Sequence, residues 1–240
     1  MITIAASLAL LATLSLGRWQ LGRAAQKEGL QAAIDSKGAQ PRLDNRSLAA
    51  LPVAATALHR SVNLRGTWVA ERTVFLDNRQ MNAKPGLYVV TPLMLDGSTQ
   101  AVLVQRGWVA RNFMDRASVP TVAAPVGVVE VQGRIAPPPS KLYELGTPET
   151  GLIRQNLDMA QFKVESGLVL LDVTVQQTGA ASEGLLREWP QASAGSAKNY
   201  GYAFQWFGLG TLIAFLYVWF QIGKRYLSPR KPPRKLPHKP

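Results

Sequence analysis

The 240-residue chain has no cysteine and only two histidines, His59 and His238. Without cysteine it can form no disulfide framework, no thiolate metal site and no cysteine nucleophile. Since His238 lies in a basic tail, little is left from which to build a metal site. The missing cysteines do not identify the compartment, because a domain of this size can fold without disulfides.

The sequence also lacks the motifs of common enzyme classes. It has no P-loop, no dinucleotide-binding glycine fingerprint after a strand and no HExxH. A Ser-His-Asp arrangement would have to use His59, which stands beside Arg60 in a chain without a nucleophile elbow. The carboxylates are scattered, with nothing to pair them for acid–base work. We therefore expect a protein that is not an enzyme.

Acidic residues are absent from positions 224–240, which carry seven basic residues in a chain of formal net charge +12. A basic domain would suggest nucleic acid. A basic tail directly after an apolar segment is instead typical of membrane topology. We expect the membrane, and no nucleic acid, as the partner of this tail.

The apolar run at residues 204–222 predicts a membrane span. It holds no formal charge, and at about 1.5 Å rise per residue it crosses most of a ~30 Å hydrocarbon core. Tyr202 and Trp206 lie at one end, and Trp219 and Tyr226 at the other. Aromatic residues in these places are typical interfacial anchors.

A second apolar run, residues 2–16, is shorter than the roughly 20 residues that a span usually needs. The alternative is a signal peptide, but no basic region precedes the run and no small-x-small cleavage site follows it. We favour an uncleaved anchor that continues as a helix, and Met1 need not be the true start of the protein.

The basic tail sets the expected orientation, because dense Lys/Arg clusters stay in the cytoplasm. Two spans then place both termini in the cytoplasm of a bacterial cell and the middle of the chain in the periplasm, with the protein in the inner membrane. Arg18, Arg23 and Lys27 follow the first run and argue for the opposite orientation. The tail is the denser cluster, and we give it priority.

Between the spans, extended segments alternate with turn signals, which predicts a compact antiparallel barrel or sandwich. The predicted fold class is an α+β membrane protein, with two transmembrane helices flanking this β-rich extramembrane domain. Helix is expected at residues 18–34 and again at 158–165, where Asp158 can cap the first turn. The last extended segment reads as a strand buried on both faces. The segments are 61–69, 73–78, 86–95, 100–109, 126–135, 152–157 and 168–175.

The chain is thus expected to have six parts. They are a first transmembrane helix (1–17), a helical extension (18–36), a periplasmic β-rich domain (37–179), a Gly/Ser/Ala-rich return linker (180–201), a second transmembrane helix (202–223) and a basic cytoplasmic tail (224–240).

Four short polar-aromatic signatures stand out. Arg79 and Arg106 each lie in or beside a predicted strand, and Trp108 follows Arg106 on the same face. The alternative for the arginines is a solvated or locally capped side chain, and for Trp19 and Trp206 a plain interfacial anchor. The signatures are LGRWQ at 16–20 with Arg23, DNR at 77–79 followed by Gly86, QRGWV at 105–109 and YAFQWF at 202–207.

At these signatures the chain resembles the SURF1/Shy1 family of cytochrome c oxidase assembly factors. LGRWQLGR resembles the family's LGxWQ–R motif, VQRGWV resembles VNRGWV, and YAFQWF resembles the YAxxWF that opens the second span. Residues 66–93 resemble the central block of the family. GRIAPPP and the later NLD fall where the family has its PEPP and W–D regions. The resemblance covers nearly the whole chain in the same order.

This resemblance implies a non-enzymatic role in maturing the haem a-containing subunit of cytochrome c oxidase, with oxidase subunits as partners. Bacterial members are linked to haem a binding or delivery and carry a histidine in the pattern HxxYA before the second span. Asn199 stands at that position here, and asparagine is a poor axial ligand for haem iron. Tyr200 or Tyr202 could substitute. The resemblance therefore implies at most a transient contact with haem a and no other cofactor.

Two sets of residues are the predicted sites. Arg79 and Arg106 are expected to bind haem propionates, because guanidinium pairs well with carboxylates. Tyr202 and Trp206 are expected to contact the haem at the membrane surface. A structural adaptor of another envelope complex, without cofactor, is the alternative function. The predicted partner-binding residues are Trp19, Gln20, Arg23, Trp108 and Gln205.

Overall fold

The structure is a computed structural model that describes residues 1–51, 54–115, 118–143, 151–223 and 226. It contains two compact units, Met1–Leu30 with Ala192–Pro240, and Gln31–Gln191. We call them the helical unit and the β-domain, and describe each by itself. Apart from Tyr226, the tail predicted at 224–240 lies outside the described residues.

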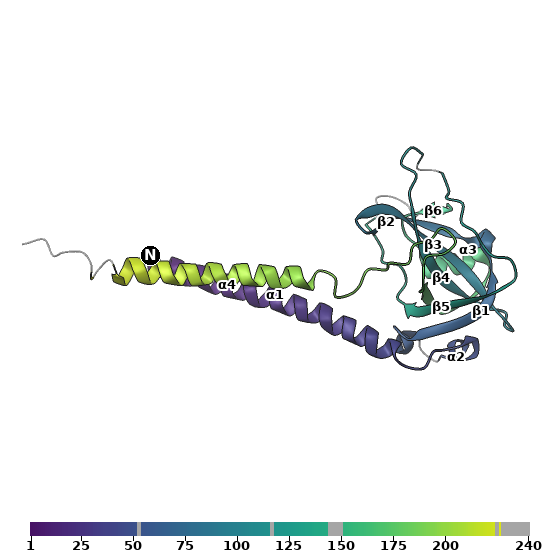
Figure 1. The fold of residues 1–240 in the computed structure, drawn as a ribbon, viewed down its shortest axis with the longest axis horizontal. Coiled ribbons are helices and arrows are strands. Elements are labelled where there is room, and N and C mark those ends of the chain that lie inside the picture. Colours follow the sequence, from purple (N-terminus) through teal and green to yellow (C-terminus); the bar gives the residue numbers. More distant parts are fainter. Residues whose placement is uncertain (52–53, 116–117, 144–150, 224–225, 227–240) are drawn as a thin grey trace, which may run out of the picture. The chain divides into compact units, whose positions relative to one another are not determined.

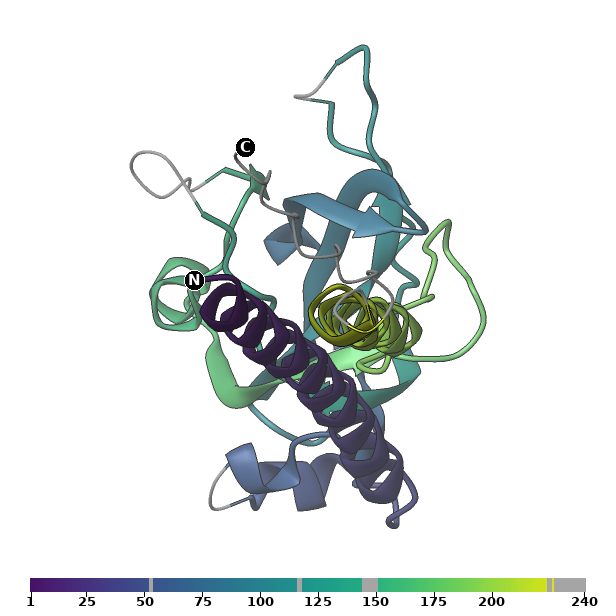
Figure 2. The ribbon, with the colours of Figure 1, turned by 90° about the vertical axis from the view of Figure 1, so that its left-hand side faces the viewer.

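Two antiparallel helices form the helical unit (Figures 1 and 2). They are α1 (Ile2–Gly38), which continues past the unit, and α4 (Ser196–Val218), which ends in a π-helical turn (Trp219–Gly223). The Tyr217 hydroxyl lies 3.2 Å from that of Thr3, near the start of α1. The predicted extension at 18–36 follows the first span without a break, because α1 is one helix.

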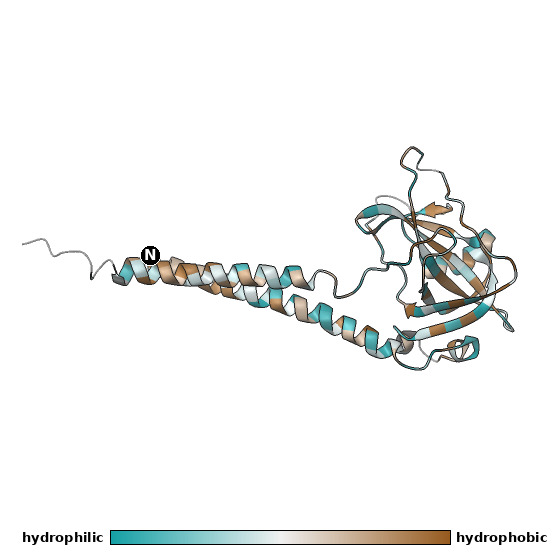
Figure 3. Cartoon of the chain, in the orientation of Figure 1, coloured by the Kyte–Doolittle hydropathy of each residue, from teal (hydrophilic) through white to brown (hydrophobic). Residues whose placement is uncertain are grey.

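Both helices are long and apolar enough to cross a membrane. Only 11% of the apolar window of each is buried, whereas the core helix of a soluble protein is mostly buried. Phe204 and Phe215, for example, expose 79% and 61% of their surface. Figure 3 shows the hydrophobic residues concentrated toward the N-terminal end of α1 and the facing end of α4. The chain is a membrane protein with two predicted spans in these helices.

A closed ring of five strands forms the centre of the β-domain. Around the ring, β1 (Ser61–Trp68) pairs with β5 (Val128–Ala136), β5 with β7 (Val169–Gln177), β7 with β4 (Gln100–Ala110), β4 with β3 (Lys84–Leu95), and β3 with β1. If the five ring strands are renumbered 1 to 5 in chain order, their order around the ring is 1-2-3-5-4. This is the five-stranded Greek-key arrangement of an OB-fold. Closure leaves the ring without an unpaired edge.

Two further strands extend the sheet beside the ring. The long β3 also pairs with β2 (Val74–Met81), which in turn pairs with the two-residue β6 (Ile153–Arg154). All seven predicted extended segments are therefore strands. The pairings are antiparallel except β4–β7 and β2–β6, which are parallel. Short helices are α2 (Asn45–Ala49), α3 (Met159–Ser166) and two 3-10 turns (Ala54–Ala57, Ala70–Arg72).

The strand that is buried on both faces is β4, and not β7 as predicted. The segment 168–175 was expected to be buried on both faces, but Val169 is 60% exposed and the Asp172 side chain 84% exposed. Instead β4 is buried at every residue from 101 to 108. Val102 and Val104 face the barrel interior, while Ala101 and Leu103 pack in a second cluster with Phe162 of α3.

Helix α3 begins and ends as its sequence indicates. The Asp158 carboxylate accepts from the N–H groups of Ala160 and Gln161, which confirms the predicted cap. Gly167 ends the helix with φ of 70°, a left-handed conformation that glycine adopts without strain. Phe162, 2% exposed, anchors the helix on the sheet.

The chain between β7 and α4 differs from the linker predicted at 180–201. Residues 180–189, here called the strap, pack on the β-domain: Leu185 is 1% exposed, and Leu186 forms a β-bridge with Trp108. The Trp189 indole N–H donates to the Gln177 carbonyl at 2.7 Å. Helix α4 then begins at Ser196. The Gly, Ser and Ala residues suggested a tether. They stand in the chain between larger residues, such as Leu185 and Trp189, whose side chains anchor the strap.

The ion pair that ties α3 to β6 predicts a loss of stability in acid. Arg154, 4% exposed, donates two hydrogen bonds to the Glu165 carboxylate, at 2.9 and 2.7 Å, and these bonds hold the pKa of Glu165 below its ordinary 4.5. A carboxyl whose folded pKa is lowered stabilises the fold above its unfolded pKa, and that contribution is lost as pH falls through the folded value. Urea unfolding at pH 7 and pH 3.5 should therefore differ less in Glu165→Gln than in wild type. Glu130→Gln, at an exposed position of β5, should leave the difference unchanged, and equal curves for Glu165→Gln and wild type would contradict the assignment.

Candidate functional site at the junction of the two helices

Small residues line the contact between α1 and α4. Thr13, Gly17 and Gly210 are buried in it. A Cβ on Gly17 would lie 2.8 Å from Cε1 of Phe207, and a Cβ on Gly210 would lie 3.0 Å from Oγ1 of Thr13. The helices can approach this closely only without those side chains, which is how helices associate within membranes. Gly17 and Phe207 belong to the first and last sequence signatures.

Beyond this contact, away from Met1, polar side chains join the same two helices. The Lys27 ammonium donates to Asn199 Oδ1 at 2.8 Å, and Asn199 Nδ2 donates to Gln20 Oε1 at 2.7 Å. The Tyr200 hydroxyl donates to the Glu28 carboxylate at 3.0 Å. We call these five residues the polar clamp. An ammonium can only donate, so the Lys27 contact also fixes which end of the Asn199 amide is the oxygen.

The polar clamp lies where α1 leaves its apolar run. Residues 2–16 carry no charge, and Gln20 and Lys27 follow one and three turns later. Hydrogen bonds between named positions of two helices favour one register of the pair. The clamp therefore holds the two helices in one alignment at the expected membrane surface.

The structure brings the predicted residues of α1 and α4 to this same junction. Gln20 belongs to the clamp, while Trp19 and Tyr202 expose 57% and 51% of their surface. Arg23 is exposed and donates to Gln26 at 3.3 Å. Gln205 is exposed and Trp206 half-buried. Their predicted roles in binding a partner or a haem stay predictions.

Arg79 lies elsewhere, inside the β-domain. The bulge before it has Asn78 at φ of 57°, and the side chain is 4% exposed. Its guanidinium donates to the carbonyls of Ser140 and Gln155, both at 2.8 Å, and burial lowers its pKa. Arg79 thus fastens two loops to β2. Its predicted contact with a haem propionate stays a prediction.

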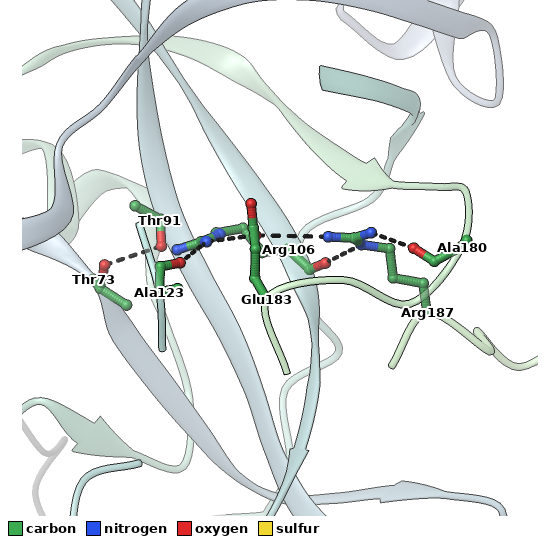
Figure 4. A network of polar contacts seen from close by, with 7 residues as sticks. All are labelled: Thr73, Thr91, Arg106, Ala123, Ala180, Glu183 and Arg187. Atoms are coloured by element: carbon green, nitrogen blue, oxygen red, sulfur yellow. Dashed lines mark hydrogen bonds and ion pairs between the residues drawn. The ribbon is translucent and has the colours of Figure 1, made fainter. Parts of the chain in front are cut away.

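Arg106 is bound inside the β-domain in a similar way (Figure 4). It is 1% exposed and donates through Nη2 to the Ala123 carbonyl at 2.5 Å and to the Glu183 carboxylate at 2.7 Å. Its guanidinium carbon lies 4.7 Å from the centre of the Trp68 ring. Binding of a haem propionate by Arg106 also stays a prediction.

Trp108 is 3% exposed, and its indole N–H donates to the Arg79 carbonyl at 2.9 Å. These are the contacts of a core residue. Its predicted role in binding a partner stays a prediction, although in this conformation its side chain offers almost no surface to one.

The residues around position 199 do not fit an axial haem ligand. Both ends of the Asn199 amide are engaged in the clamp, and the Tyr200 hydroxyl is bound to Glu28. The histidine described in the structure is His59, which lies in the β-domain, with its pKa lowered by burial. Within the described residues, no group of three His, Cys, Asp or Glu side chains could hold a metal ion. Position 199 is built as a helix fastener.

Sequence reasoning missed the partners of the signature residues. From the sequence, Lys27 was interpreted only as a basic residue after the first span, Glu28 was given no role, and Glu183 and Arg187 fell within the predicted linker. A signal for the clamp was present: residues 13, 17, 20, 24 and 27 follow spacings of three and four, which place them on one helix face. No comparable local signal joins Glu183 to Arg106.

The chain resembles known proteins over most of its length. Residues 7–211 match the model of the SURF1 family. The chain is 23% identical to a SURF1-like protein of Rickettsia bellii over 90% of this chain and 87% of that one. It is 27% identical to the cytochrome oxidase assembly protein SHY1 of Saccharomyces cerevisiae and 28% identical to Surfeit locus protein 1 of Arabidopsis thaliana. Those two alignments cover 40% and 44% of this chain, but only 25% and 32% of the relatives' own lengths.

The close contact at Gly17 can be tested because the chain has no cysteine of its own. Thr13→Cys with Gly210→Cys should form a disulfide between α1 and α4, since the Thr13 Oγ1 lies 3.0 Å from the Cβ position of residue 210. Adding Gly17→Leu should abolish most of the cross-link, because the new side chain displaces Phe207. The matched control is Gly22→Leu on the same helix, where nothing lies within 4 Å. Equal cross-linking in the two leucine variants would contradict the packing.

Proposed function

This chain belongs to the SURF1 family, and on that premise we propose that it is a membrane-bound assembly factor for a cytochrome oxidase. The yeast relative is named as an assembly protein of that enzyme. The observation that carries the proposal is the junction of α1 and α4, where Gly17 of the first signature packs on Phe207 of the last and the polar clamp joins the two helices. It holds an exposed aromatic surface in a fixed arrangement at the expected membrane interface.

The proposed mode of action is contact with a client rather than catalytic turnover. Trp19 and Tyr202 are exposed beside the clamp, and partly exposed aromatic rings are frequent anchors of protein interfaces. Among the β-domain carboxylates, Asp77, Glu165 and Glu183 are each paired with an arginine. Such pairing favours structural roles for these three groups over acid–base chemistry.

In this proposal the client is the haem a-bearing subunit of the oxidase. A transient haem would lie against the rings of Tyr202 and Trp206, without an axial ligand from position 199. Arg79 and Arg106 would have to bind its propionates beside, or in exchange for, the acceptors that they hold in the structure.

We place the β-domain in the periplasm and both termini in the cytoplasm of a bacterial cell. The antiparallel helices support a hairpin whose two ends lie on the same side of the membrane. A cytoplasm-active reporter fused after Pro240 should therefore be active. Activity only from a periplasm-active reporter at that position would contradict the orientation.

Loss of the exposed aromatic surface should reduce oxidase assembly. Trp19→Ala and Trp206→Ala should lower the amount of assembled oxidase by up to about tenfold, the range of interface anchors, at unchanged abundance of this chain. The control is Trp219→Ala, which removes a 52% exposed ring at the other end of α4. If the abundance of this chain fell equally in all three variants, the tryptophans would act only as membrane anchors. Purification of the wild type with a different partner set would favour an adaptor of another complex.

Position 199 can be tested by absorption spectroscopy. We expect Asn199→His, purified after co-expression with the oxidase genes, to show a Soret band that wild type lacks, because imidazole ligates haem iron and an amide does not. Asn199→Gln, which keeps an amide, is the control. Equal bands in wild type and Asn199→His would show that iron is held by another residue.

A further inference from the structure

Two arginines and one glutamate are buried together between β4 and the strap (Figure 4). The side chains of Arg106, Arg187 and Glu183 are 1%, 4% and 19% exposed. One carboxylate oxygen of Glu183 lies 2.7 Å from Arg106 Nη2 and 3.7 Å from Arg187 Nη2. The cluster therefore carries one more positive charge than negative, and an uncompensated buried charge is unfavourable.

The hydrogen bonds of this cluster are also incomplete. Arg187 donates to the carbonyls of Arg106 and Ala180, at 2.9 and 2.5 Å. Among the described residues, Arg106 Nε and Arg187 Nη2 are buried without a hydrogen-bond acceptor. Buried donors are nearly always paired. The cluster thus lacks an acceptor as well as a negative charge.

A tight turn of the strap presents the one carboxylate of the cluster. Ser182 and Leu185 form a β-bridge, and the two residues between them, Glu183 and Gly184, have φ of 58° and 74°, the left-handed conformations that such a two-residue turn requires. The turn places the Glu183 carboxylate against Arg106.

Arg106 also forms part of the wall of a cavity of about 420 Å³, a size typical of small-molecule sites. Its apolar walls include Phe75, Val122 and Leu152, and Thr73 and Thr121 also line it. The Thr73 hydroxyl lies 3.0 Å from that of Thr91. A charged group, hydroxyls and an apolar surface thus meet in one cavity.

We propose that this cavity binds a small amphipathic carboxylate, with the carboxylate held by Arg106 and Thr73 and the apolar part against Phe75, Val122 and Leu152. Guanidinium and carboxylate form strong charge-assisted hydrogen bonds. This guanidinium already donates to one carboxylate, that of Glu183. A carboxylate bound beside Arg106 would add the negative charge that the cluster lacks. The proposal does not depend on the role in oxidase assembly.

Glu71 also lines the cavity and is exposed. Its negative charge opposes an anion, but solvent and salt screen a group in that position. It therefore weakens the site without closing it, and offers a variant that should strengthen binding.

Octanoate is a suitable probe, and the cysteine-free chain allows a labelling test. In the full chain in neutral detergent, Thr121→Cys places one thiol on the cavity wall. Octanoate should slow its reaction with a maleimide, whereas 1-octanol and octylamine at equal concentration should not. Ser98→Cys, outside this cavity, is the control and should react at one rate throughout.

Two further changes test the charge itself. In the Thr121→Cys background, Arg106→Gln should raise the octanoate concentration needed for protection about tenfold or more, the effect of losing a hydrogen bond to a charged group. Because Arg106 also supports the core, Glu71→Gln gives a second test at an exposed position, and should lower that concentration about twofold. Equal protection by octanol or octylamine, no protection by octanoate, or no response to Glu71→Gln would overturn the proposal.

Discussion

The close approach of α1 and α4 is the contact on which the helical unit depends. Two helices with mostly apolar surfaces gain little from burying one another in lipid, so packing and interhelical hydrogen bonds must hold them together. Gly17 provides the packing by leaving room for Phe207. Gln20, Asn199 and Lys27 provide the hydrogen bonds. Both kinds of contact come from the same face of α1, where Gln20 and Lys27 lie about one and three turns beyond Gly17.

The β-domain is held together by arginines in a comparable way. Arg79, Arg106 and Arg154 are each at most 4% exposed and reach from a strand to a loop, the strap or α3. A guanidinium suits this use because its five donors can satisfy several acceptors at once. Removal of one such residue would leave carbonyls and carboxylates of the β-domain without these partners. The strap shows the same principle, since Glu183 meets Arg106 while Leu185 fills the adjacent core.

The elements of this fold could be predicted from local sequence, and the contacts between them could not. Alternation and turn signals located all seven strands, and Asp158 marked the start of α3. Nothing local indicates that β3 pairs with both β1 and β2, which closes the ring. Burial was misjudged for the same reason. The run at 168–175 contributes to both clusters, but it includes Asp172, whose side chain is exposed, whereas β4 is buried at every residue from 101 to 108.

The candidate site divides in the same manner. The aromatic residues Trp19, Tyr202 and Trp206 could be found because membrane interfaces favour such side chains at the ends of apolar runs. Lys27 and Glu28 could not be assigned, since their partners lie more than 170 positions away and depend on helix register. Arg79 and Arg106 were recognised as unusual, but sequence could not show that each is bound within the protein.

Asn199 shows how family membership and the role of one residue come apart. A histidine at this position offers iron a ring nitrogen, whereas an asparagine offers a short amide with one donor and one acceptor end. Those two ends match Gln20 Oε1 and the Lys27 ammonium on the facing helix. Position 199 thus stabilises the alignment of the two helices through its amide. The exposed rings of Trp19 and Tyr202 take no part in these hydrogen bonds, so the surface proposed to meet the client needs no iron ligand at this position.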